Sequence, residues 1–371
     1  GAGTVLSPFG GKHQCTPVDA MVATLPFLEG QTKTCTHMSW GFNANIATWS
    51  PYHGAAYAVT ESVCRAVASG ARLSDIRLTL QEYFPKLGDD SSRWGLPFAA
   101  LLGAFKAQHE LRLGAIGGKD SMSGTFNDID VPPTLVSFAL APGNTRHVVS
   151  PEFKEVNSLI SFIEVPRDEN QLPDFRALKE IADTLHGANI LAAHTLDHGG
   201  IATGLSKMSF GNGIGASIKT DINLHQERFL SFLIESKEEI TGGIVIGKTQ
   251  IEPTIQVGSD TLKLGELYDA WTNPLSEIYP ETADPSTSEA DTFNSTFEVK
   301  HSNTKSQNPK VIIPAFPGTN SEYDSAKAFR EAGALAKIQI FRNLTPQAVE
   351  ESLADLAKSI RKSQILMLPG G

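Results

Sequence analysis

Cysteine is scarce in this chain. The 371 residues include only three cysteines, Cys15, Cys35 and Cys64, and these show no CxxC spacing. An odd number of cysteines without such spacing is typical of reduced thiols in a cytosolic protein, and it argues against a disulfide framework or a zinc site. We therefore expect a cytoplasmic protein without structural disulfides.

Basic residues and long apolar runs are also in short supply. The formal net charge is −10 at pH 7. Nucleic acids and anionic membranes attract proteins through clustered Lys and Arg, so we expect neither as a partner. No uninterrupted apolar run approaches the roughly 20 residues of a membrane-spanning helix, and the first residues do not resemble a secretory signal. The expected partners are small molecules and other protein domains.

The residue pattern divides the chain into four segments. Residues 1–150 and 151–271 each mix strand and helix patterns, and 310–371 alternates strands with helices. Residues 272–309 are rich in Ser, Thr, Pro and acidic residues and poor in aliphatic ones. We expect two α/β or α+β lobes, an interdomain linker with little regular structure, and the beginning of a doubly wound domain with a parallel sheet.

Two long helices are expected in the first segment. Ser50 and Pro51 suit the N-terminus of a helix that runs to Ser69, and Gly70 suits its end. A second helix is expected from Ser92 to Leu111. Its large apolar side chains are expected to fill the core: Trp94, Phe98, Leu101, Leu102, Phe105 and Leu111.

A glycine-rich stretch at 114–125 separates the second helix from a strand expected at 134–140. Adjacent glycines let the backbone approach a ligand, and the lysine, aspartate and hydroxyls that follow suit a phosphate ester and its metal ion. The stretch is not a Walker P-loop, because an aspartate follows the lysine. A plain polar turn is the alternative. The candidate phosphate-binding residues are Gly117, Gly118, Lys119, Asp120 and Ser121.

A second candidate anion site follows a strand expected at 189–193. A glycine pair between that strand and a helix expected at 201–210 would direct free N–H groups at an anion. His194 and His198 are four apart, but they flank a turn instead of sharing a helix face, so a metal role is the weaker interpretation. We expect both glycine-rich stretches to converge on one pocket between the lobes. The candidate residues here are Asp197, His198, Gly199 and Gly200.

Several motifs resemble one known family. Gly118–Ser123, which reads GKDSMS, resembles a signature in the second synthetase half of formylglycinamide ribonucleotide amidotransferase, also called phosphoribosylformylglycinamidine synthase. Ser137–Ala141 and Arg146–Pro151 continue the likeness, and Pro314–Asp324 resembles the opening of that enzyme's glutaminase domain. The resemblance implies a two-lobe half of the aminoimidazole ribonucleotide synthetase type, followed by the start of a flavodoxin-like class I glutaminase.

The resemblance also implies ATP or ADP and magnesium as cofactors of the whole enzyme. In the family, the second half can hold magnesium through an Asp, a Glu and an Asn one helical turn apart, and another Asp. Asp19 and Glu61 stand at two of these positions, but Arg65 and Thr195 replace the Asn and the last Asp. We therefore expect Arg65 to pair with Glu61 and to substitute for the metal ion.

By resemblance, the whole enzyme converts formylglycinamide ribonucleotide, ATP and glutamine to formylglycinamidine ribonucleotide, ADP, phosphate and glutamate. A class I glutaminase needs a cysteine nucleophile, and no cysteine follows Cys64. We expect an internal fragment, inactive by itself, whose first synthetase half and remaining glutaminase belong to the same native chain. The residues expected to frame the glutamine pocket are Pro317, Gly318, Thr319, Asn320, Gly370 and Gly371.

Two other interpretations remain open. The chain could be a nucleotide-holding or purely structural half without chemistry, which the substituted metal positions favour. It could instead be a stand-alone ATP-dependent synthetase that forms a homodimer through its first lobe. A strand pattern that stops at Gly371 argues against the stand-alone enzyme.

Overall fold

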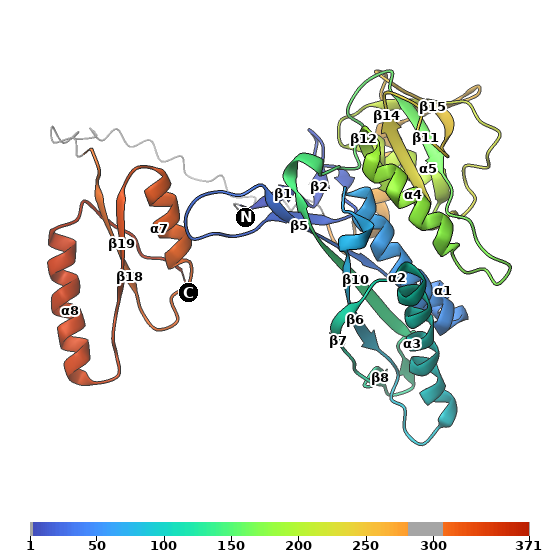
Figure 1. Ribbon diagram of the computed structural model, residues 1–371. Coiled ribbons are helices and arrows are strands. Elements are labelled where there is room, and N and C mark those ends of the chain that lie inside the picture. Colours follow the sequence, from blue (N-terminus) through green and yellow to red (C-terminus); the bar gives the residue numbers. More distant parts are fainter. Residues whose placement is uncertain (1–2, 281–306, 371) are drawn as a thin grey trace. The chain divides into compact units, whose positions relative to one another are not determined.

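The computed structural model describes residues 3–280 and 307–370, which divide into two compact units (Figure 1). Most of the expected linker, residues 281–306, lies outside the described residues. No helix in the described ranges is long and apolar enough to cross a membrane.

The first unit contains residues 3–25 and 32–280, and the second contains residues 26–31 and 307–370. Two sheets divide the first unit into lobes. We call residues 3–25 and 32–150 the N-lobe and residues 151–280 the C-lobe.

The N-lobe is built on a six-stranded sheet in the order β1-β4-β5-β10-β6-β7. Neighbouring strands are antiparallel except β6 and β7, which are parallel. The sheet strands are β1 (Thr4–Leu6), β4 (Met21–Thr24), β5 (Thr34–Gly41), β6 (Arg77–Tyr83), β7 (Ala115–Lys119) and β10 (Thr134–Asn144). The short elements are β2 (Phe9–Gly10), β3 (Thr16–Pro17), α1 (Ala44–Trp49), η1 (Leu73–Asp75), β8 (Thr125–Phe126), β9 (Ile129–Asp130) and η2 (Thr145–His147).

Helix α2 (Pro51–Ala68) packs on one face of this sheet. It begins as the sequence predicts, because the Ser50 hydroxyl accepts a hydrogen bond from the His53 amide and Pro51 occupies the first turn. Its residues are mostly small, including Ala55, Ala58 and Ala66, and they are almost completely buried. Small side chains let this one helix contact the sheet, α3 and the C-lobe together.

Helix α3 (Ser91–Leu111) corrects one prediction. Its small residues face α2 and the core, with Ala100, Ala104 and Ala107 buried. The large side chains expected in the core are instead exposed, except Leu111: Trp94, Phe98, Leu101, Leu102 and Phe105. Helical periodicity shows that residues share a face, but it does not show which face meets the core.

The other face of the N-lobe sheet carries a row of exposed apolar side chains. Met21 is the cross-strand partner of Met38, and Met38 is the cross-strand partner of Leu140, so the row crosses β4, β5 and β10. These three side chains are between 37% and 49% exposed.

The C-lobe is built on a seven-stranded sheet in the order β12-β14-β11-β15-β13-β16-β17. Only β13 and β16 pair in parallel. The strands are β11 (Leu159–Ile163), β12 (Ile190–Thr195), β13 (Gly215–Ile218), β14 (Phe232–Ser236), β15 (Ile244–Gln250), β16 (Thr254–Val257) and β17 (Asp260–Lys263). The helices are α4 (Phe175–Gly187), α5 (Gly200–Phe210), α6 (Leu264–Thr272) and the short η3 (Asn273–Leu275).

The C-lobe sheet has a core on each face. Helix α4 shares a core with α2 and α3 of the N-lobe, so Leu178 and Phe232 belong to the same apolar cluster as Ala58. Helix α5 packs on the opposite face, where Leu205 and Met208 meet Phe162. The lobes are therefore joined through a continuous apolar core.

The second unit contains a parallel three-stranded sheet in the order β19-β18-β20. Its elements alternate along the chain: β18 (Lys310–Ala315), α7 (Glu322–Glu331), β19 (Leu335–Ile340), α8 (Pro346–Arg361) and β20 (Ile365–Leu366). Thr345 caps α8 through its hydroxyl, with Pro346 in the first turn. This arrangement confirms the parallel strand–helix alternation predicted from the sequence.

Candidate functional site

The first glycine-rich stretch forms an edge strand instead of a simple turn. Gly118 lies in β7, where a Cβ atom would approach the carbonyl oxygen of Leu80 on β6 to 2.1 Å. Gly117 has φ +151°, a conformation that favours glycine. Gly118 is therefore required by the pairing of β7 with β6, and Gly117 is favoured by its own backbone conformation.

The polar residues that follow β7 are exposed and mostly bonded to one another. Lys119 Nζ donates to the carbonyl oxygen of Asp120 at 2.8 Å, and the hydroxyls of Ser121 and Ser123 lie 2.8 Å apart. No ion pair involving Lys119 or Asp120 occurs among the described residues. The lysine is thus accessible to an anionic ligand.

A buried acid that the sequence analysis missed lies close to this stretch. Glu82 on β6 is buried, and burial followed by the nearby charge of Asp120 raises its pKa. Its Oε1 atom has no hydrogen-bond partner among the described residues. The residues next to Glu82 in β6 do not indicate that its carboxyl is buried, because burial depends on how other elements pack against the strand.

The second glycine-rich stretch follows β12 and opens α5. Gly199 and Gly200 have φ of +82° and +61°. A Cβ atom on Gly200 would lie 2.3 Å from the carbonyl oxygen of Gln226, and the Gly199 amide donates to the Glu227 carboxylate at 3.3 Å. The glycines therefore serve a close loop contact, and a carboxylate of this chain already occupies part of the predicted anion site.

The two histidines of this stretch point to different partners. His194 is buried, and its Nδ1 lies 2.7 Å from Oδ1 of Asp19. His198 is exposed, and Asn43 Nδ2 donates to its Nε2 at 3.3 Å while its ring packs edge-on against Phe229. The two histidines therefore share no partner among the described residues.

Asp197 is held by a lysine that the sequence did not reveal. Lys207 Nζ lies 2.9 Å from both carboxylate oxygens of Asp197. The two residues are ten positions apart, across the turn that opens α5, so no helical spacing predicts their contact. This ion pair leaves little capacity for Asp197 to bind a cation.

The two glycine-rich stretches lie at separate places along the N-lobe sheet. Asn43, which contacts His198, follows β5, whereas Lys119 ends β7 at the edge of the same sheet. Three strand spacings separate β5 from β7, or roughly 14 Å. Figure 1 also places β7 in the part of the N-lobe that lies away from α5. A pocket shared by the two stretches would have to span this distance, and it stays a prediction.

The positions expected to hold magnesium form a buried charge cluster. Asp19 Oδ2 accepts a hydrogen bond of 2.6 Å from the Thr195 amide, in addition to the His194 contact. Arg65 lies 2.7 Å from Glu61, as predicted, and Glu61 also accepts from the Phe42 amide at 2.9 Å. These four side chains come from both lobes and meet between β12 and α2.

The pKa values of the two carboxyls in this cluster shift in opposite directions. Burial alone would raise the pKa of Asp19, but His194, Arg65 and the Thr195 amide together hold it below its ordinary value. Burial raises the pKa of Glu61, and Arg65 opposes that rise. Asp19 is thus the firmly ionised member of the cluster.

A magnesium ion does not fit this cluster. Within residues 3–280 and 307–370, no three His, Cys, Asp or Glu side chains are arranged to hold a metal ion. Both oxygens of Asp19 and both oxygens of Glu61 already have partners in the chain. Mg²⁺ demands six oxygen ligands in near-octahedral geometry, which two occupied carboxylates do not supply.

The described residues expected to frame a glutamine pocket follow β18 and β20, and they meet there. Gly318 has φ +89°, and the Thr319 hydroxyl accepts a hydrogen bond from the Phe316 amide at 3.0 Å. The Asn320 amide donates to the carbonyl oxygen of Gly370 at 2.8 Å, so the two predicted parts meet. Pro317 precedes this turn, and Gly371 lies outside the described residues.

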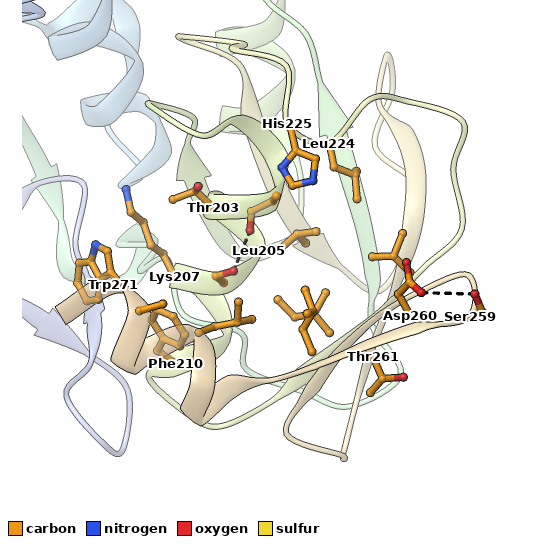
Figure 2. Close-up of a pocket in the computed structure, with 17 residues that line it drawn as sticks. Thr203, Leu205, Lys207, Phe210, Leu224, His225, Ser259, Asp260, Thr261 and Trp271 are labelled. Atoms are coloured by element: carbon orange, nitrogen blue, oxygen red, sulfur yellow. Dashed lines mark hydrogen bonds between the residues drawn. The ribbon is translucent and has the colours of Figure 1, made fainter. Parts of the chain in front are cut away.

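A cavity of about 840 Å³ in the C-lobe is lined by none of the predicted site residues (Figure 2). It is bounded by α5, α6 and the β16–β17 hairpin, and Phe210 and Trp271 stack at one end. Lys207 contributes to its wall but extends its amino group toward Asp197. The wall is mainly apolar and offers no cluster of catalytic groups.

Comparison with known proteins gives two findings from sequence. Residues 308–371 match the model of the CobB/CobQ-like glutamine amidotransferase domain. The subunit PurL of phosphoribosylformylglycinamidine synthase from Lactobacillus delbrueckii subsp. bulgaricus is 24% identical over 264 residues, which are 64% of this chain and 35% of that protein. The Thermoplasma volcanium PurL subunit is 24% identical over 236 residues, or 58% of this chain and 30% of that protein. The chain thus spans about a third of the length of these curated relatives.

Solved structures with a similar fold also include PurL proteins. Thermotoga maritima PurL complexed with ADP aligns with a TM-score of 0.52 at 15% identity, covering 71% of this chain and 50% of that one. A crystal structure of phosphoribosylformylglycinamidine synthase II from the same organism aligns with a TM-score of 0.50 at 18% identity, covering 67% of this chain and 38% of that one. The chain therefore combines a PurL-like synthetase fold with glutamine amidotransferase sequence at its end, and it resembles phosphoribosylformylglycinamidine synthase.

Proposed function

We propose that this chain is the second synthetase half and the start of the glutaminase of a long, single-chain phosphoribosylformylglycinamidine synthase. One observation carries the proposal: a PurL-like synthetase fold and a glutamine amidotransferase match follow each other in one polypeptide. An enzyme that uses glutamine as nitrogen donor needs both activities, and joining them in one chain keeps them in fixed proportion.

The reaction of the whole enzyme has two coupled parts. In the synthetase, the amide oxygen of formylglycinamide ribonucleotide takes the γ-phosphoryl group of ATP, and ADP leaves. Ammonia then attacks the activated carbon, phosphate leaves, and the amidine forms. In the glutaminase, a cysteine attacks the amide carbon of glutamine, ammonia is released, and water hydrolyses the thioester to glutamate.

This chain would contribute binding surfaces to that reaction. The turn at 317–320 and Gly370 would frame the glutamine side chain, since the Asn320 amide donates to the Gly370 carbonyl oxygen and so holds the two segments together beyond β18. Lys119 and its neighbours on β7 would bind phosphate, because the lysine is exposed and its amino group bonds only the carbonyl oxygen of the adjacent Asp120. The stretch at 197–200 is less suited to this role, since Glu227 and Lys207 already satisfy it.

The apolar row of Met21, Met38 and Leu140 supports a partner for the open face of the N-lobe sheet. Contiguous apolar surface of this kind commonly marks an interface. The partner in our proposal is the other synthetase half of the same native chain. For this chain in isolation, a second copy would take that place.

The experiment uses the full native protein that contains this chain. We expect it to form ADP and the amidine from formylglycinamide ribonucleotide, ATP and glutamine. Gly318→Val should abolish the reaction with glutamine but retain it with ammonium chloride, because only the glutamine pocket is disturbed. Gly333→Val is the matched control, since Gly333 also has a positive φ, +87°, but follows α7 outside the pocket.

An absence of ADP formation that depends on formylglycinamide ribonucleotide, in the unmodified native protein, would refute the proposed function. Equal loss of the glutamine and ammonia reactions in Gly318→Val alone would refute the assigned pocket.

A further inference from the structure

The buried cluster around Asp19 joins the two lobes through polar contacts. Asp19 precedes β4 of the N-lobe sheet, whereas its partners His194 and Thr195 end β12 of the C-lobe. The side chains of Asp19 and His194 are only 7% and 5% exposed. A carboxylate removed from water in this way is costly unless its charge is compensated nearby.

His194 compensates this charge at closest range, and Arg65 adds a fixed positive charge. Its guanidinium bonds Glu61 at 2.7 Å and donates to the carbonyl oxygen of Trp40 at 3.1 Å. The guanidinium carbon also lies 4.4 Å from the centre of the Trp40 ring. The side chain is thus fixed on three sides, and its charge acts on Asp19 as well as on Glu61.

A guanidinium and a divalent ion are mutually exclusive at this place. Arg65 cannot lose its proton under physiological conditions, so a metal ion between Asp19 and Glu61 would face a fixed positive charge. Thr195 offers a buried hydroxyl without a hydrogen-bond partner among the described residues, which is a poor substitute for a carboxylate ligand.

We propose that Arg65 takes the place of a divalent cation and makes the cluster of Asp19, Glu61, His194 and Thr195 a metal-independent clamp between the lobes. The clamp rests on the contacts of this chain alone. Only its comparison with a magnesium site rests on the proposed function, so the clamp can stand if the proposed reaction fails.

Thermal unfolding of the 371-residue chain tests the clamp. We expect the same Tm, within about 1 °C, in EDTA and in millimolar Mg²⁺, because no metal contributes to the cluster. Arg65→Asn should lower Tm by roughly 5–10 °C, since it leaves the buried Glu61 without its cation and weakens the charge compensation of Asp19. Arg176→Asn is the matched control: Arg176 also pairs with a glutamate four positions away, but both side chains are at least 70% exposed, so Tm should not change.

A double variant tests directly whether the Arg65 guanidinium keeps a divalent ion out of the cluster. Arg65→Asn with Thr195→Asp removes the fixed charge and places four oxygen-bearing side chains around the former guanidinium. We expect this variant to be less stable than the unmodified chain in EDTA, and to regain Tm when Mg²⁺ is added. Arg65→Asn alone should regain little, because it supplies one ligand fewer.

Mn²⁺ titration followed by electron paramagnetic resonance provides a measurement that does not depend on thermal unfolding. The unmodified chain and Asp19→Asn should bind the same amount of Mn²⁺, because Asp19 holds no metal ion. Stoichiometric Mn²⁺ binding to the unmodified chain that is lost in Asp19→Asn would overturn the proposal, as would a rise of several degrees in its Tm with Mg²⁺. An unchanged Tm in Arg65→Asn would also overturn it.

Discussion

His37 lies in the middle of β5, almost completely buried against α2. Its Nδ1 is 2.8 Å from the Ser69 hydroxyl, whose own hydrogen goes to the carbonyl oxygen of Ala66 at 2.7 Å. Ser69 must therefore accept from His37, which places the imidazole hydrogen on Nδ1. Burial lowers the pKa of His37 from 6.5 to about 4.

This burial predicts a dependence of stability on acidity. The unfolded chain takes up a proton at His37 near pH 6.5, whereas the folded chain resists until about pH 4. The free energy of unfolding should thus be fully retained above pH 6.5 and fall between pH 6.5 and 4, by on the order of 2–3 kcal/mol from this residue. Denaturant titrations across that range measure the slope. His37→Gln should flatten it, and an identical slope in both proteins would contradict the assignment.

At the scale of single elements, α3 offers a paired test of close helix packing. A Cβ atom on Gly103 would lie 1.9 Å from the carbonyl oxygen of Tyr52 on α2, whereas nothing lies within 4 Å of one on Gly95. Gly95→Ala should stabilise the chain by up to about 1 kcal/mol, because alanine favours the helix. Gly103→Ala should destabilise it by roughly 1–3 kcal/mol, since α2 and α3 must separate.

Denaturant midpoints of the two variants measure this difference directly. If both substitutions stabilise the chain equally, the close approach of α2 and α3 at Gly103 is incorrect.

The same helix illustrates what could be predicted from the sequence. The caps at Ser50 and Thr345 are local features, so the beginnings of α2 and α8 followed from residues within one turn of each. The side of α3 that meets the core was not predictable in this way. Its small residues pack on α2, and large residues such as Phe98 remain exposed, which periodicity alone does not distinguish.

The contacts of the candidate site likewise include some that local sequence spacing predicts and others that it does not. Glu61 and Arg65 are one helical turn apart, and their contact was predicted. The contact of Asp19 with His194, and the proximity of Glu82 to Asp120, depend on how strands and helices assemble, so residue spacing predicts neither of them. Only the family resemblance had placed Asp19 and Thr195 in the same site. Sequence spacing therefore predicted the local half of the site and missed the part that crosses elements.

For the molecule as a whole, we predict that the isolated chain releases no glutamate from glutamine. Its amidotransferase segment contains no cysteine, and the last cysteine of the chain is Cys64. Without a thiol there is no nucleophile for the amide carbon. Glutamate measured by a coupled dehydrogenase assay should equal that of a heat-killed sample. Release above that background would show that another group performs the attack.

The bonds between Asp19 and the end of β12 have a consequence for synthesis on the ribosome. Asp19 and its partner His194 are 175 positions apart in the sequence. The Thr16 hydroxyl accepts a hydrogen bond from the Gly211 amide, which lies 195 positions later. At about 5–20 residues per second, the nascent N-terminal hairpin lacks these partners for roughly 10–35 s. During that interval the early strands have no anchor at this end of the sheet. Slow decoding between codons 20 and 194 would prolong that exposure, and a chaperone that holds nascent chains would then act on this protein before its first lobe can close.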